Sequence, residues 1–238
     1  MHVFDSLDGA LLVDKPAGPT SHDVVDAIRR RFEIKKVGHC GTLDPNATGL
    51  LVLMLGRATK LSEKLMSDDK TYEGSAKLGE ATSSYDADGE VTGTSPVPSL
   101  TLDQLNEAAA AFIGDQWQLP PMVSAVKKNG VPLYKLARKG IEVERKERLI
   151  HLYTFQFSEY VEPIGRFRVA CTKGTYVRTL VHDLGRKLGC GAHLASLRRL
   201  SSGRFAVTDA LTFERALALS AAELEARVIP FLTLTTTG

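Results

Sequence analysis

The stretch that decides the fold reads Gly38-His39-Cys40-Gly41-Thr42-Leu43-Asp44-Pro45-Asn46-Ala47-Thr48-Gly49, and the apolar run Leu50-Leu51-Val52-Leu53-Met54-Leu55 follows it. A single acid, Asp44, therefore stands in a glycine-rich loop at the start of an expected strand. Pro45 fixes its own backbone and favours an extended Asp44, while the glycines allow a substrate to approach closely. Asp-Pro pairs also serve in ordinary turns, which is the alternative for this residue. The whole pattern favours a functional role for the Asp44 carboxylate over a role in a turn.

Positive charge is distributed unevenly along the chain. Residues 121–204 hold 17 Lys and Arg against 6 Asp and Glu, whereas residues 1–120 hold 11 against 18. Tyrosines are interleaved with these cations, which is typical of a surface that faces nucleic-acid phosphates. Arg57 and Lys60 add two cations directly after the apolar run. A solvated basic face is the alternative interpretation.

Composition bounds the class of protein. The 238 residues are 43% hydrophobic and contain neither a long apolar run nor a signal-like N-terminus, so we expect one large or two small domains, no membrane association and a cytoplasmic location. The three cysteines form no CxxC pair, and Cys190 with His193 supplies two of the four ligands that a closed zinc site needs. No metal is therefore expected. Nucleotide-binding glycine motifs are absent, so a nucleotide cofactor has no support in the sequence and no cofactor is expected.

Hydrophobic periodicity predicts a mixed chain of the α+β class. Capped helices are expected from Thr20 or Ser21 and from Thr101, and a third helix over residues 175–188, with Gly189 at its end. Alternating strands are expected at 149–157 and 167–171, with a turn at 162–165 between them, and further turns at 86–89 and 128–130.

Residues 38–62 resemble the signature of the bacterial tRNA pseudouridine synthase B family. More of the family's motifs are matched in the same order, by residues 11–18, 70–73, 120–127, 173–180 and 189–200, so the resemblance covers about residues 9 to 205. It implies the pseudouridine synthase fold, in which a long, mostly antiparallel, bent sheet with flanking helices carries a central RNA-binding cleft. Periodicity alone does not select that fold.

The resemblance also implies a reaction and a substrate. The family isomerises uridine to pseudouridine in the T-loop of tRNA, at tRNA position 55, on a flipped-out nucleotide, and needs no cofactor. Asp44 would be the catalytic carboxylate. The implied partner is the T-arm of tRNA, bound by a monomer without an obligate protein partner. Two alternatives are a non-catalytic tRNA-binding or folding factor and a synthase of the same family that acts on another RNA.

Three residues receive specific roles from the resemblance. Arg178 would lie against the carboxylate of Asp44 and keep it charged, although an arginine on a helix face can also be solvated. Tyr72 would stack on the flipped uracil, the alternative being an ordinary half-buried strand tyrosine. His39 would insert into the RNA as a wedge in place of the flipped nucleotide, the alternative being a histidine that caps a turn.

Four further residues are expected to support the site. Tyr176 and Leu197 would line the base pocket, with apolar core positions as the alternative. Lys15 and Lys60 are expected to position backbone and phosphate and to take no part in the bond changes. Ordinary structural use is expected for the histidines at 22, 151, 182 and 193.

The expected organisation is a catalytic domain at 1–207, with an RNA-gripping insertion at about 122–147, and a short helical extension at 208–238. About thirty residues follow Gly203-Arg204-Phe205, including a capped helix from Ser220. Longer family members continue into a small C-terminal RNA-binding domain, which we do not expect here in full.

A T-arm minihelix is therefore expected to be modified about as well as whole tRNA. The physical reason is that contacts to the acceptor arm would be few without that additional domain. Rates of pseudouridine formation measured side by side on the two RNAs test this. A preference for whole tRNA by orders of magnitude would contradict it.

Overall fold

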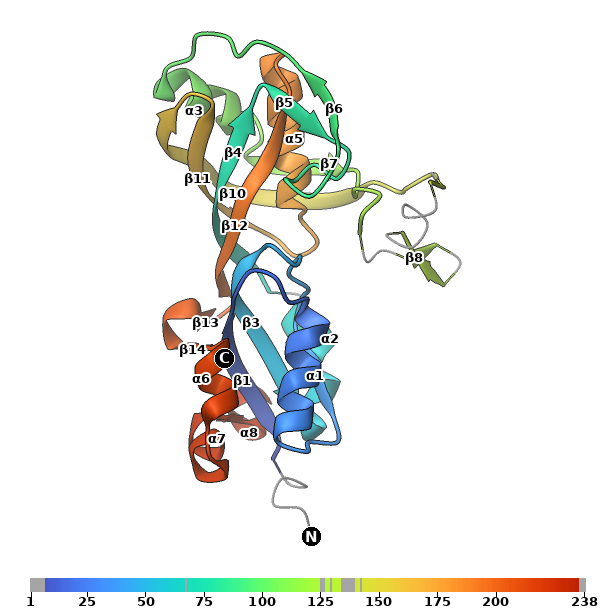
Figure 1. Cartoon of the computed structure of the whole chain (residues 1–238), viewed down its shortest axis with the longest axis vertical. Coiled ribbons are helices and arrows are strands. Elements are labelled where there is room, and N and C mark those ends of the chain that lie inside the picture. Colours follow the sequence, from blue (N-terminus) through green and yellow to red (C-terminus); the bar gives the residue numbers. More distant parts are fainter. Residues whose placement is uncertain are drawn as a thin grey trace. The chain divides into compact units, whose positions relative to one another are not determined.

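The computed structural model describes residues 7–66, 68–124, 127–128, 130–133, 140–141 and 143–235 (Figure 1). The chain divides into two compact units. The first holds Met1–Tyr72 and Arg198–Gly238, and the second holds Glu73–Leu197. Both boundaries fall inside strands, so β4 (Lys70–Leu78) and β12 (Ala192–Ser202) each contribute residues to both units.

The sheet of the first unit is built around β1 (Gly9–Lys15) and β3 (Thr48–Leu55). These strands pair antiparallel, from Gly9 opposite Leu55 to Lys15 opposite Gly49. The strand order is β14-β1-β3-β12, and both outer joins are parallel. The short strands are β2 (Val37–His39) on β3, β13 (Phe205–Ala206) on β12, and β14 (Leu211–Thr212) and β15 (Ile229–Pro230) on β1. This register sets the end of β1 beside the loop that precedes β3.

Both faces of β1 and β3 are buried, which explains the uninterrupted apolar run of β3. Residues 51, 53 and 55 pack with α1 (Ser21–Arg31), which lies along these strands in Figure 1, and with residues of the segment that holds α6 (Phe213–Ala218) and α7 (Ala221–Arg227). Residues 50, 52 and 54 pack on the other face with η1 (Gly56–Leu61), α2 (Ser62–Met66) and α8 (Phe231–Thr235); η2 (Val207–Asp209) follows β13. Each such buried side chain contributes about 1.5–3 kcal/mol, so β3 is firmly anchored below the Asp44 loop.

The sheet of the second unit has the order β12-β4-β11-β10-β7, where β7 is Gly114–Gln118. The predicted strand pair is confirmed as β10 (Arg148–Val161) and β11 (Ile164–Cys171), with the turn at Glu162 and Pro163. Helix α3 (Leu102–Ala110) is tied to β10, because Asn106 Nδ2 donates to the Phe157 carbonyl at 3.0 Å and Asn106 Oδ1 accepts from the Phe157 amide at 2.7 Å.

The predicted turns at 86–89 and 128–130 join short hairpins. The first lies between β5 (Glu80–Thr82) and β6 (Val91–Thr94), and the second between β8 (Lys127–Lys128) and β9 (Val131–Pro132). Asn129 and much of the predicted insertion at 122–147 lie outside the described residues. The RNA-gripping role of that insertion stays a prediction.

Side-chain caps start three helices at the expected positions. In α1, Thr20 Oγ1 accepts from the Asp23 amide at 3.0 Å, and the Asp23 carboxylate accepts from the Thr20 amide at 2.8 Å. The same reciprocal capping box starts α3 at Thr101 and α7 at Ser220. These predictions are confirmed because capping depends on residues only three positions apart.

Helix α5 (Val177–Leu188) begins two residues later than the predicted start at 175. Tyr176 has an extended backbone and is the N-cap, and Gln118 of β7 holds both of its backbone groups. Gln118 Oε1 accepts from the Tyr176 amide at 2.8 Å, and Gln118 Nε2 donates to the Tyr176 carbonyl at 3.1 Å. The helix ends at Gly189, as predicted, with a left-handed φ of 80°.

The predicted α+β class is confirmed, with a large mixed sheet and flanking helices. Most of the described strand pairings are antiparallel. The central cleft and the domain boundary at 207 stay predictions. Among the described residues, no helix combines the length and apolar character needed to cross a membrane.

Candidate active site

Asp44 lies half-buried in the loop between β2 and β3, and its neighbours on both sides are anchored. Before it, Ser21 Oγ accepts from the Leu43 amide at 2.8 Å and donates to the Leu43 carbonyl at 3.0 Å. After it, the Pro45 carbonyl accepts from the Gly18 amide at 2.9 Å. The predicted position of Asp44, in a well-specified loop at the start of an apolar strand, is what the structure shows.

Lys15 fixes the same loop from the end of β1. Its ammonium donates to the carbonyls of Pro16, Pro45 and Ala47, each at 2.8 Å, and the residue is 0% exposed. Two of these three acceptors are within three residues of Asp44. The geometry supports the expected role of Lys15 in positioning backbone.

The charge of Lys15 is sensitive to its surroundings. Burial lowers the pKa of Lys15 to about 8, because the charged form loses its hydration. The negative charge of Asp44 opposes this shift, and the cation of Arg199 adds to it. Lys15 and Asp44 therefore interact electrostatically in addition to sharing the loop.

Lys15→Met is expected to change the pH dependence of stability between pH 8 and 10.5. The pKa of Lys15 is about 8 in the folded chain and near 10.5 in the absence of burial, so the unfolded chain binds more protons in this window. Lys15 therefore makes the free energy of unfolding rise with pH there, by on the order of 3 kcal/mol in total, and the methionine variant lacks that rise.

Chemical denaturation of both proteins at pH 7, 8, 9 and 10 measures the effect. Above pH 8, the unfolding free energy of the wild type should increase relative to that of Lys15→Met. A difference that stays constant from pH 7 to 10 would contradict the prediction.

Arg199 is a second buried cation beside the loop. It is 1% exposed, and its guanidinium donates to the Leu50 carbonyl through Nε at 2.7 Å and to the Gly41 carbonyl through Nη2 at 3.1 Å. The adjacent Arg198 forms a two-point ion pair with Asp14, at 3.0 and 2.6 Å. These side chains join β12, β1 and the loop within the first unit.

Gly49 is required by the approach of β12. Its φ is 98°, and a Cβ added there would lie 2.3 Å from the carbonyl oxygen of Arg199. The glycine therefore serves the chain's own packing. The sequence suggested close approach at this glycine and assigned it to a substrate.

His39 and Tyr72 also belong to the first unit. His39 is the half-buried last residue of β2, and its pKa is lowered by burial and by the nearby charges of Arg199 and His22. Its imidazole is accordingly neutral at pH 7. Tyr72 lies in β4 and is 9% exposed.

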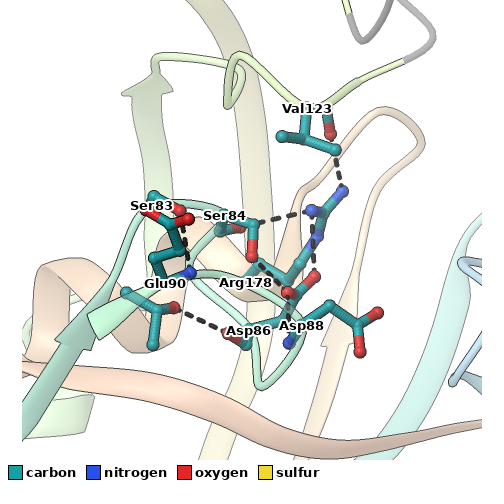
Figure 2. Close-up of polar contacts among 8 residues, drawn as sticks. Ser83, Ser84, Asp86, Asp88, Glu90, Val123 and Arg178 are labelled. Carbon is teal, nitrogen blue, oxygen red and sulfur yellow. Dashed lines mark hydrogen bonds and ion pairs between the residues drawn. The ribbon is translucent and has the colours of Figure 1, made fainter. Parts of the chain in front are cut away.

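Arg178 is the most strongly held side chain of the second unit's predicted site (Figure 2). It lies in the first turn of α5 and is 4% exposed. Its Nη1 donates to the Ser84 carbonyl at 3.2 Å and to Asp86 Oδ2 at 3.1 Å, and its Nη2 donates to the Val123 carbonyl at 2.9 Å. The alternative of a solvated arginine on a helix face is therefore wrong.

Both carboxylate oxygens of Asp86 accept hydrogen bonds in this arrangement. Its Oδ2 pairs with Arg178, while Oδ1 accepts from the Ser84 hydroxyl and, at 3.1 Å, from the Asp88 amide (Figure 2). The guanidinium is thus oriented by a carboxylate and two backbone carbonyls.

The remaining predicted residues take simpler positions. Tyr176 is half-buried at the N-cap of α5, and Leu197 is half-buried in β12. Lys60 is exposed in η1. The first unit therefore holds Lys15, His39, Asp44, Lys60 and Tyr72, and the second holds Tyr176, Arg178 and Leu197.

Sequence reasoning missed the partners of these residues. Asp86 was interpreted only as a turn residue, because the motif Asp-Ala-Asp-Gly gives no sign of an ion pair 92 positions away. The long-range contacts of Arg199 and Lys15 could not be predicted from the sequence either. Among the described residues, no three His, Cys, Asp or Glu side chains come together in a group that could hold a metal ion.

Residues 29–177 match the TruB family pseudouridylate synthase (N terminal domain), and residues 178–231 match the tRNA pseudouridylate synthase B C-terminal domain. The chain belongs to the TruB family. It is 56% identical over 224 residues to tRNA pseudouridine synthase B of Opitutus terrae, covering 94% of this chain and 93% of that protein. It is 50% identical over 208 residues to the enzyme of the same name from Syntrophotalea carbinolica, covering 87% and 68%.

Solved structures agree with this membership. The chain is similar to one in the crystal structure of a Cbf5-Nop10-Gar1 complex, with a TM-score of 0.74 and 28% identity. It is also similar to one in an H/ACA RNP bound to a substrate RNA containing 2′-deoxyuridine, with a TM-score of 0.66 and 25% identity. The matches cover 97% and 96% of this chain but only 61% and 60% of those chains. The pseudouridine synthase fold predicted from the motifs is confirmed.

Proposed function

We propose that this TruB family member is a tRNA pseudouridine synthase that converts the uridine at position 55, in the T-loop, with Asp44 as its essential acid. The curated relatives at 56% and 50% identity carry the name tRNA pseudouridine synthase B. The observation that carries the proposal is the anchored loop around Asp44, held by Lys15 and Ser21.

The reaction is an isomerisation that one carboxylate can serve. The bond between ribose C1′ and uracil N1 breaks, the detached base turns, and a bond between C1′ and C5 replaces it. The proton displaced from C5 leaves and N1 gains one, so no atom, electron or cofactor is added. Asp44 acts as nucleophile at the base, as nucleophile at the sugar, or as a base at the ribose, and each route requires its ionised form.

Arg178 is proposed to keep Asp44 ionised and oriented. A guanidinium beside a carboxylate favours the charged form of the acid. Support comes from the second unit itself, where Arg178 is almost fully buried and its orientation is set by Asp86 and two carbonyls. A guanidinium with so fixed an orientation can align the carboxylate of Asp44.

The aromatic and apolar residues are proposed to hold the flipped nucleotide. Tyr72 stacks on the uracil while it turns, and Tyr176 and Leu197 line the pocket that receives it. His39 fills the space that the nucleotide leaves in the RNA. Its lowered pKa supports this use, since a neutral ring stacks among bases without bringing a charge.

The basic stretch of residues 121–204 is proposed to bind the T-arm, together with Lys60. Lys60, exposed in η1, is available to RNA phosphates, whereas Lys15 is fully buried and serves the loop backbone. A monomer in the cytoplasm, without an obligate protein partner, is part of the proposal. The Cbf5 structure contains additional proteins, and size-exclusion chromatography with light scattering decides this point for the present chain.

The decisive experiment is product mapping with the wild-type protein. Uridine-labelled tRNA is incubated with the protein and no cofactor, and pseudouridine is located by position, with a tRNA that carries cytidine at position 55 as the control. Product at position 55 that is absent from the control supports the proposal. Tight binding without product indicates an RNA-binding factor, and product only in other RNAs indicates a different substrate.

A further inference from the structure

Two stacked rings lie next to the ion pair between Arg178 and Asp86. The centroids of Tyr85 and His182 are 3.9 Å apart, and their planes are inclined by 17°. Tyr85 directly precedes Asp86 in the turn between β5 and β6, and His182 follows Arg178 by four residues on α5. Residues four apart lie on the same helix face, so turn and helix are joined by two adjacent contacts.

The backbone of Tyr85 is in an unfavourable conformation. Its φ is 67°, in the left-handed region that residues other than glycine rarely adopt. Such strain persists only where the surroundings fix the backbone. Here the Tyr85 amide donates to the Thr82 carbonyl at 3.2 Å, and the Tyr85 carbonyl accepts from the Leu194 amide at 2.9 Å. Tyr85 is therefore used where a glycine would be easier, which points to a task for its ring.

The face of the His182 ring is the part that makes the stacking contact. Among the described residues its buried Nδ1 has no hydrogen-bond partner. Burial, and next the charge of Arg186, lower its pKa, so the imidazole is neutral at pH 7. The histidine thus neither anchors a hydrogen bond through Nδ1 nor carries charge. Among the described residues, the interaction that the structure shows for this ring is its stacking on Tyr85.

We propose that Tyr85 and His182 are positioning residues that act through Asp86 on Arg178. The stack holds the turn against α5, which keeps the Asp86 carboxylate on the guanidinium and so fixes the orientation of Arg178. Neither ring is assigned contact with the RNA. The inference rests on the proposed function, because it assumes that Arg178 serves pseudouridine formation.

The variants distinguish the effect of losing a ring from the effect of the unfavourable backbone conformation at Tyr85. Tyr85→Gly removes the ring and suits the φ of 67°, and His182→Ala removes the other half of the stack. Tyr85→Phe and His182→Phe keep a ring on each side. Single-turnover rates of pseudouridine formation, tRNA dissociation constants and melting temperatures are measured for all four variants.

The expected result is a loss in rate with binding retained. Tyr85→Gly and His182→Ala should slow the single-turnover reaction roughly threefold to tenfold, the range that the loss of an aromatic pair gives, and change tRNA affinity less than about twofold. The phenylalanine variants should react at the wild-type rate within about twofold. The double variant should be no slower than the slower single variant, since both changes break one contact.

A variant destabilised elsewhere in the same unit provides the control. Asn106→Ala removes the two hydrogen bonds between α3 and β10 and touches neither Tyr85 nor Arg178. It should lower the melting temperature and leave the rate unchanged.

Unchanged rates in Tyr85→Gly and His182→Ala, slow phenylalanine variants, or an effect on affinity alone would each overturn the inference. A wild-type protein that forms no pseudouridine would overturn the proposed function instead.

Discussion

Asp44→Asn is expected to bind tRNA normally and to form no measurable pseudouridine. The amide has the same shape, but it can neither attack as a nucleophile nor accept a proton as the carboxylate does. The loop should keep its conformation, because Ser21 and Lys15 hold its backbone groups. A loss of at least about 10⁴-fold in rate is typical for removal of an essential catalytic group. Single-turnover product mapping together with filter binding measures both quantities.

Asp103→Asn is the matched control for this variant, since Asp103 is an exposed acid in the first turn of α3. It should retain the wild-type rate. If Asp44→Asn lost tRNA affinity in proportion to product, the protein would be better described as a binding factor. If it still formed product, another acid would carry the reaction.

Replacement of Arg178 is expected to have the second-largest effect on activity. Arg178→Met should reduce the single-turnover rate by about 10²- to 10³-fold, the range found when one group that stabilises catalytic charge is removed. Arg178→Lys should recover little of this, because one ammonium cannot meet the carboxylate of Asp86 and the carbonyls of Ser84 and Val123 with a guanidinium's geometry. Rates measured at saturating enzyme isolate this step from binding.

Stability gives an independent measure of the same ion pair. Asp86→Asn leaves the nearly buried guanidinium without its carboxylate and should lower the free energy of unfolding by about 3 kcal/mol or more. Arg215→Met is the control, because its pair with Glu223 at 2.9 Å is exposed, at 57% and 47%, and such pairs contribute about 1 kcal/mol at most. Equal losses in the two variants would contradict the assigned importance of the Arg178 pair.

Local features of the fold could be predicted from the sequence because their causes are local. The caps at Thr20 and Thr101 depend on residues three positions away, and the alternation of β10 and β11 depends on burial of one face. The start of α5 was misplaced by two residues for the opposite reason. Gln118, 58 positions before Tyr176, holds its backbone in an extended conformation.

In the candidate site, too, residues could be identified from local motifs, whereas their long-range partners could not. Residue types and order identified Asp44 and Arg178 as site candidates through the family motifs, and the fold that these motifs implied is confirmed. The partners that orient them could not be predicted, because Asp86 and the carbonyls bound by Lys15 are brought close only by the folded chain. No change of composition marks the unit boundaries either, since they fall within β4 and β12.

The buried ammonium of Lys15 has a consequence for the energetics of RNA recognition. A loop tied by two hydrogen bonds from one fully buried cation is ordered before any RNA arrives. It loses little conformational entropy when substrate binds, so this loop adds little to the unfavourable part of the association, to which unstacking of the uridine contributes. RNAs should accordingly be discriminated by how readily they release that nucleotide, and a T-loop in which the base is already weakly stacked would gain most from so rigid an acid.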